Sequence, residues 1–207
     1  MINIRQGYFK VHPDTPTPGV KGDYPNSVHY GNLYRLNRAK EQVTLPTVDI
    51  ASIIDYVIEF LETIGIEIKT SPIVKEPLNV TYKNIKEENE LEDERDIVWM
   101  KFTTDGYLGV VATSNDINFN IPKSEAEYDS RERYYNDYER KYEYPWKYNT
   151  AGILIHQLGK QWDTSFVLVF PLKNIPKGYN RGDIERAIGN CLIDKGVPIL
   201  DFYSHNY

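Results

Sequence analysis

The clearest pattern of hydrophobic positions lies between residues 48 and 64. Apolar residues recur there at the i, i+3, i+4 and i+7 spacing of a buried helical face, while acidic residues occupy the opposite side. Thr47 is a suitable N-cap, and Gly65 suits the left-handed turn that ends many helices. The pattern therefore predicts a helix over about residues 48–64 whose apolar stripe packs in the core.

A second core-packing helix is predicted over about residues 181–195. Its inward stripe consists of Ile184, Ala187, Ile188, Cys191 and Leu192. Asn180 can cap its first turn, and Gly196 suits its end. The apolar runs 164–172 and 197–203 flank this helix and are typical of strands. We therefore predict a C-terminal β-α-β unit, in which two parallel strands are joined by a right-handed crossover.

Several short runs rich in β-branched and aromatic residues lie between the two helices and predict strands. The runs are 66–74, 78–85, 97–104, 107–113, 117–121 and 152–158. Turn residues separate most of them, which favours an antiparallel meander. Together with the two helices, these strands predict the α+β class with a mixed β-sheet.

The N-terminal region, about residues 11–46, is predicted to be an irregular arm. Residues 12–27 contain four prolines and two glycines, and proline disfavours helix both at its own position and in the residue before it. The chain has no internal repeat and no clear linker, so we expect one compact α+β domain over its 207 residues.

A charged, tyrosine-rich segment follows the strands. Seven of the chain's 17 tyrosines lie between residues 128 and 148. Ser124 and Glu127 form a possible capping box, and four of the tyrosines are spaced by seven, three and four residues. A helix over about residues 124–143 is predicted, with Tyr128, Tyr135, Tyr138 and Tyr142 on one face and Trp146 beyond its end.

A stripe of phenol rings suits either the edge of the protein's own core or the centre of a protein interface. We therefore take Tyr128, Tyr135, Tyr138, Tyr142 and Trp146 as candidate partner-binding residues, for another protein or for self-association. Stacking on single-stranded nucleic acid is a further use of such rings. The acidic residues interleaved with the tyrosines argue against it.

The composition narrows the choice of function. The formal net charge of −6 argues against general nucleic-acid binding. The single cysteine excludes an internal disulfide and a cysteine-rich zinc site, which fits a reducing, cytoplasmic compartment. No apolar run approaches the roughly 20 residues that cross a bilayer, and we find no secretory signal pattern. Frequent Ile, Asn, Lys and Tyr are typical of AT-rich genomes, such as those of low-GC bacteria and their phages.

Candidate catalytic chemistry is sparse. Glu67 and Lys69 match the E-x-K half-motif of metal-dependent nucleases, but no acidic residue is predicted on a neighbouring strand. Alternation around them is equally typical of a half-buried strand. The histidines show no zinc-site spacing, and no phosphate-binding loop is present, so we predict neither a metal nor a cofactor.

A different possibility is a pocket at the carboxyl ends of the C-terminal parallel strands, where open α/β sheets bind ligands. His156, predicted on a strand, would line this pocket with Asp201 and His205, and Lys173 or Arg181 would hold an anionic group.

The sequence thus leads to two functional hypotheses. The favoured one is a small intracellular protein-binding protein, of the kind represented by inhibitor and immunity proteins, that docks through the tyrosine-rich helix. The alternative is an enzyme or small-ligand-binding protein that uses the C-terminal pocket, with a metal-dependent nuclease as one variant.

Overall fold

The structure, a computed structural model, describes residues 36–68, 73–75, 82–91, 97–113, 117, 134–136, 141–143, 150–179 and 181–201. Residues 36–42 form a helix. The helices that follow are α2 (Ile50–Thr63), α3 (Tyr82–Glu88), α4 (Thr150–Gln157) and α5 (Arg181–Asp194). The strands are β1 (Glu67–Ile68), β2 (Ile73–Lys75), β3 (Ile97–Phe102), β4 (Leu108–Ala112), β5 (Tyr134–Asn136), β6 (Lys141–Glu143), β7 (Val167–Lys173) and β8 (Ile199–Asp201).

Six strands form one mixed sheet, in the order β1-β7-β3-β4-β8, and β2 also pairs with β7. All the pairs are antiparallel except β4 with β8, which is parallel. β1 pairs with residues 172–173 of β7 and β2 with residues 167–169, so the two short strands follow one another along the same edge. The α+β class predicted from the sequence is confirmed.

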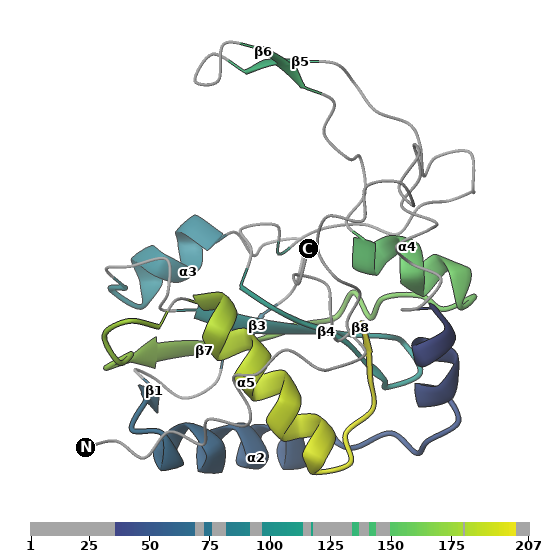
Figure 1. Ribbon diagram of the computed structural model, residues 1–207, viewed down its shortest axis with the longest axis horizontal. Helices are drawn as coiled ribbons and strands as arrows, with labels where there is room; N and C mark the ends of the chain where they lie inside the picture. Colours follow the sequence, from purple (N-terminus) through teal and green to yellow (C-terminus); the bar gives the residue numbers. More distant parts are fainter. Residues whose placement is uncertain are drawn as a thin grey trace.

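Helices cover both faces of this sheet (Figure 1). One hydrophobic cluster joins α2 and α5 to the sheet, and a second joins α3, α4 and the helix at 36–42 to the other face. Residues of β3 alternate between the clusters: Met100 lies in the first and Trp99 in the second. Because both faces are buried, β3 and β4 consist of buried residues throughout.

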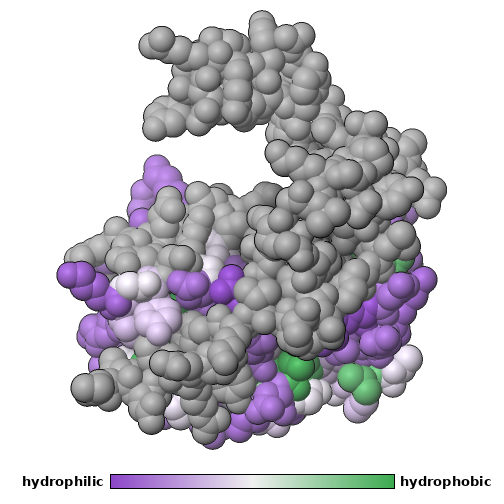
Figure 2. Space-filling model, viewed as in Figure 1, coloured by the Kyte–Doolittle hydropathy of each residue, from purple (hydrophilic) through white to green (hydrophobic). Residues whose placement is uncertain are grey.

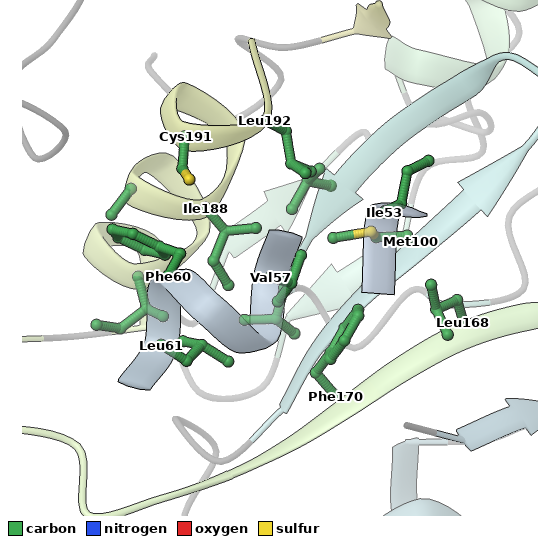
Figure 3. Close-up of a cluster of buried hydrophobic side chains, with 14 of the residues drawn as sticks. Ile53, Val57, Phe60, Leu61, Met100, Leu168, Phe170, Ile188, Cys191 and Leu192 are labelled. Atoms are coloured by element: carbon green, nitrogen blue, oxygen red, sulfur yellow. The ribbon is translucent and has the colours of Figure 1, made fainter. Parts of the chain in front are cut away.

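The cluster between α2, α5 and the sheet is shown in Figure 3, where labelled side chains of the two helices, of β3 and of β7 point toward one another. Its labelled members are Ile53, Val57, Phe60, Leu61, Met100, Leu168, Phe170, Ile188, Cys191 and Leu192. Full burial of an aliphatic or aromatic side chain of this size stabilises a fold by roughly 1.5–3 kcal/mol. Both core-packing helices predicted from apolar spacing are therefore confirmed.

The N-cap of α2 differs from the prediction. Asp49, rather than Thr47, caps the helix, because its carboxylate accepts a hydrogen bond of 2.9 Å from the Ser52 amide. At the other end, Gly65 adopts a φ of 73°, the left-handed conformation predicted for it.

The meander and the C-terminal unit are confirmed only in part. β3 and β4 form an antiparallel pair, but β1 and β2 pair with β7 instead of with β3. The successive pairings make β7 and β8 run in the same direction, with α5 between them in sequence, as predicted. β3 and β4 lie between these two strands, so the parallel neighbour of β8 is β4.

Three helices replace predicted strands or loop. Residues 82–88, within and just beyond the predicted strand 78–85, form α3. Residues 36–42 of the predicted irregular arm are helical, because Leu36, Ala39 and Val43 contribute to the core on one side of the chain. Residues 43–46 of the arm are irregular, and residues 11–35 lie outside the described residues.

The third helix is α4, which replaces the strand predicted over residues 152–158. A short apolar run fits a buried helix as well as a buried strand. Gly159 then ends the helix with a φ of 67°, and the Lys160 amide donates a hydrogen bond of 3.0 Å to the Ile155 carbonyl. His156 therefore lies on a helix.

The tyrosine-rich helix predicted over about residues 124–143 is wrong where the structure describes it. Residues 134–136 and 141–143 form β5 and β6, an antiparallel pair in which Tyr135 lies opposite Tyr142. Aromatic side chains lose rotamer freedom in a helix and favour strands, so the tyrosines outweigh the helix-forming charges here. In the part of the chain that the structure describes, no helix is long and apolar enough to cross a membrane.

Candidate functional site

The carboxyl ends of β4 and β8 lie at the same edge of the sheet, because these two strands are parallel. Val110 of β4 is the partner of Asp201, the last residue of β8, and Thr113 directly follows β4. Helix α5 contacts β4, and its second turn brings Glu185 to this edge. Three polar residues that are distant in sequence are thus brought together.

All three side chains are buried. Thr113, Glu185 and Asp201 have exposed fractions of 5%, 7% and 1%. The Thr113 hydroxyl donates a hydrogen bond of 2.8 Å to Oε2 of Glu185, and the Thr113 amide also donates to this carboxylate. A buried carboxyl group needs such partners, because its transfer from water otherwise costs several kcal/mol.

The environment of Glu185 changes its ionisation. Burial raises the pKa of Glu185 from 4.5 to about 8, although the hydrogen bonds from Thr113 oppose this rise. The negative charge of Asp201 raises the pKa further, and the nearby Arg186 lowers it. Glu185 is therefore protonated at neutral pH. Chemically it can donate a hydrogen bond or a proton, next to a second carboxyl group.

This group of residues overlaps only at Asp201 with the pocket predicted from the sequence. His156 lies on α4, which packs on the face of the sheet opposite to α5. Lys173 ends β7, where its ammonium group is 3.7 Å from the Glu67 carboxylate on the surface. Arg181 begins α5, and His205 lies outside the described residues.

Among the residues that the structure describes, Glu67 lies near a basic side chain and not in a group of metal ligands. Its side chain is exposed and pairs with Lys173, and Lys69 lies outside the described residues. Among the described residues, no group of three or more His, Cys, Asp or Glu side chains is placed to hold a metal ion. The described geometry therefore gives the nuclease variant no support.

The candidate partner-binding residues lie partly in the second sheet. Tyr135 is in β5 and Tyr142 in β6, and within the described part of the chain these strands pair with each other and with no other strand. Tyr128, Tyr138 and Trp146 lie outside the described residues.

The sequence analysis missed Thr113 and Glu185. A signal for Glu185 is present, because this acid directly follows Ile184 and precedes Ile188 by one turn, on the border of the apolar stripe. Thr113 gives no comparable signal, since threonine is common at the end of a strand.

Comparisons with known proteins add no relative: no family model matches the chain, and neither a curated protein nor a solved structure does.

Proposed function

We propose that this protein acts by docking on another protein and that the β5–β6 hairpin makes the contact. The observation that carries the proposal is that β5 and β6 form a sheet of their own, which Figure 1 draws away from the six-stranded sheet. β5 and β6 pair through six residues, and Tyr135 lies opposite Tyr142 in this pairing. Tyrosine is enriched at protein interfaces, because its ring provides apolar area and its hydroxyl provides a hydrogen bond.

The rest of the described surface offers less for a partner. Helices cover both faces of the large sheet, and Leu45, with an exposed fraction of 43%, is the one exposed large hydrophobic residue among those described. Figure 2 shows a described surface that is mostly hydrophilic on this side, with small separate hydrophobic spots. These observations favour the hairpin over the body of the protein. Docking without catalysis is the mode of action of inhibitor and immunity proteins, the class we propose.

The hairpin provides its own matched control for an experiment. The double variant Tyr135→Ala/Tyr142→Ala removes one register pair, and Asn136→Ala/Lys141→Ala removes the next. Partners would be captured from a lysate of the source cells with each protein, and the affinity of every captured protein would then be measured. We expect the tyrosine variant to bind its partner about 30-fold or more weakly, as for an interface hot spot, and the control variant to bind within a few-fold of the unmodified protein.

Retention of every partner with unchanged affinity by the tyrosine variant would refute the docking proposal. Self-association is distinguished by light scattering over a range of protein concentrations. If the partner is a second copy of this chain, only the tyrosine variant should lose the larger species.

A second candidate function is supported by a separate observation, the buried group of Thr113, Glu185 and Asp201. A carboxyl group with a strongly shifted pKa at the carboxyl ends of parallel strands is typical of enzyme and ligand sites. In this candidate, protonated Glu185 donates a hydrogen bond to a small molecule.

A ligand found by screening should bind at least tenfold more weakly to Glu185→Gln than to Glu62→Gln, an exposed control on α2. Equal binding to both variants would exclude this site.

A further inference from the structure

Three elements meet at the buried polar group, and each contributes one side chain. Glu185 comes from α5, Asp201 from β8, and Thr113 from the residue after β4. The hydrogen bond from Thr113 to Glu185 joins residues 72 positions apart. The apolar side chains of α5 pack on this sheet as well, and the polar group adds a hydrogen-bonded contact to the first half of the helix.

Among the described residues, two charged side chains act on Glu185. Asp201 faces it from β8, and Arg186 adjoins it on α5, with its guanidinium 3.6 Å from the Asp183 carboxylate. Glu185 is therefore next to one negative charge, and the neighbouring positive charge is already partly balanced.

The other helix and the central strand contribute no charge at this point. Helix α2 meets α5 through an ion pair of 3.0 Å between Glu59 and Lys195, beyond the opposite end of α5. Lys101 of β3 lies over the Trp162 ring, in the cluster on the other face of the sheet.

We infer that the buried carboxyl group of Glu185 carries a proton in the folded protein and that, in this neutral form, it joins the first half of α5 to Thr113 at the carboxyl end of β4. Two adjacent buried carboxylates cannot both be charged without a large cost in free energy. A neutral Glu185 keeps its hydrogen bond with Thr113 and avoids repulsion from Asp201. The device is independent of whether a ligand or a partner binds nearby.

The sign of the resulting pH dependence follows from the two pKa values of Glu185. In the unfolded chain Glu185 ionises near its ordinary pKa of 4.5, whereas in the folded protein its pKa is about 8. Between these values the folded state binds one more proton than the unfolded state, so stability falls as the pH rises through this window. Below pH 4.5 and above pH 8, Glu185 contributes no further change.

Urea unfolding from pH 5 to pH 9 tests this inference on the full chain. Glu185→Gln keeps the shape and the hydrogen-bonding groups but does not titrate, and Glu62→Gln on α2 is the exposed control. The unfolding constant of the unmodified protein, divided by that of Glu185→Gln, should rise by up to about tenfold per pH unit until near pH 8 and then level off. Glu62→Gln should follow the unmodified protein. A ratio that is constant over this range would overturn the inference.

The protonation of Glu185 can also be measured directly, which gives a second test if a variant is too unstable for the unfolding experiment. Infrared spectroscopy of the folded protein at pH 7 should show a protonated carboxyl band that Glu185→Gln lacks, and the band should disappear as the pH is raised past about 8. Asp201→Asn removes the neighbouring negative charge that raises the pKa of Glu185, so the same band should then disappear at a lower pH than in the unmodified protein. Absence of the band at pH 7 would overturn the inference, whichever variants fold.

Discussion

At the scale of single residues, Gly109 packs closely against the ring of Trp162. A Cβ added at Gly109 would lie 2.1 Å from Cζ3 of Trp162 and 3.1 Å from the backbone oxygen of Lys101. We predict that Gly109→Ala destabilises the protein by about 1–3 kcal/mol, because the indole ring must move within a filled core. The midpoint of urea unfolding, followed by circular dichroism, measures this loss.

A double-mutant cycle tests the cause of that loss. Phenylalanine at position 162 lacks the outer ring atoms that clash with the added methyl group. Gly109→Ala should therefore cost less in a Trp162→Phe background than in the unmodified protein. Equal costs in the two backgrounds would show that Trp162 is not the reason.

Of the buried polar residues Thr113, Glu185 and Asp201, the sequence alone predicted the position of one. Asp201 was predicted to lie at the carboxyl end of a parallel strand, and it does. Glu185 was not singled out, because its burial depends on how α5 is placed on the sheet, and this placement is set by contacts far away in sequence. Its pKa is raised mainly by this burial, lowered by the hydrogen bonds from Thr113 and raised by Asp201, and only the folded chain brings these residues near.

At the scale of elements, the start of α2 gives a prediction that separates two capping residues. Asp49→Ala should raise the unfolding constant about fivefold, since it removes the hydrogen bond to the Ser52 amide, whereas Thr47→Ala should have little effect. Hydrogen bonds from Ser52 lower the pKa of Asp49 below its ordinary value of 3.8. The contribution of Asp49 is therefore present above that pH and is lost as the pH falls through the lowered pKa.

Urea unfolding of both variants at pH 7 and at pH 3 measures this effect. The difference between Asp49→Ala and the unmodified protein should shrink at the lower pH. A larger effect of Thr47→Ala than of Asp49→Ala would mean that the helix is capped as the sequence pattern suggested.

Elements with a long one-sided apolar stripe were predictable, and short ones were not. The stripes of α2 and α5 extend over 14 residues each, so their periodicity is unambiguous. Helix α4 has only eight residues and a nearly continuous apolar core, a pattern that a buried strand shares. In the segment of β5 and β6, regular spacing of the tyrosines favoured a helix, but their preference for strands prevailed.

At the scale of the whole molecule, the order of the strands depends on pairings between distant segments. β7 lies between β1 and β3, although 54 residues separate it in sequence from β4, the nearest preceding strand of the large sheet. Local patterns identify strands but contain no information on which edge a later strand will occupy. The class of the fold was therefore predictable from the sequence, and the sheet order was not.

The separation into two sheets predicts an uneven resistance to hydrogen exchange. β3 and β7 are central and buried on both faces, so their amides should exchange only when the whole sheet opens. β5 and β6 have three residues each and, among the strands that the structure describes, pair with each other alone; an isolated two-stranded hairpin is marginally stable in water. Hydrogen exchange measured by mass spectrometry should thus show peptides from 134–143 exchanging orders of magnitude faster than those from 97–102 and 167–173.

Binding of the partner should slow hydrogen exchange in the hairpin more than in the large sheet, because docking orders the hairpin. Equal protection of the hairpin and the central strands in the protein alone would mean that β5 and β6 are held by the body of the fold, and the proposal of a free docking hairpin would fail.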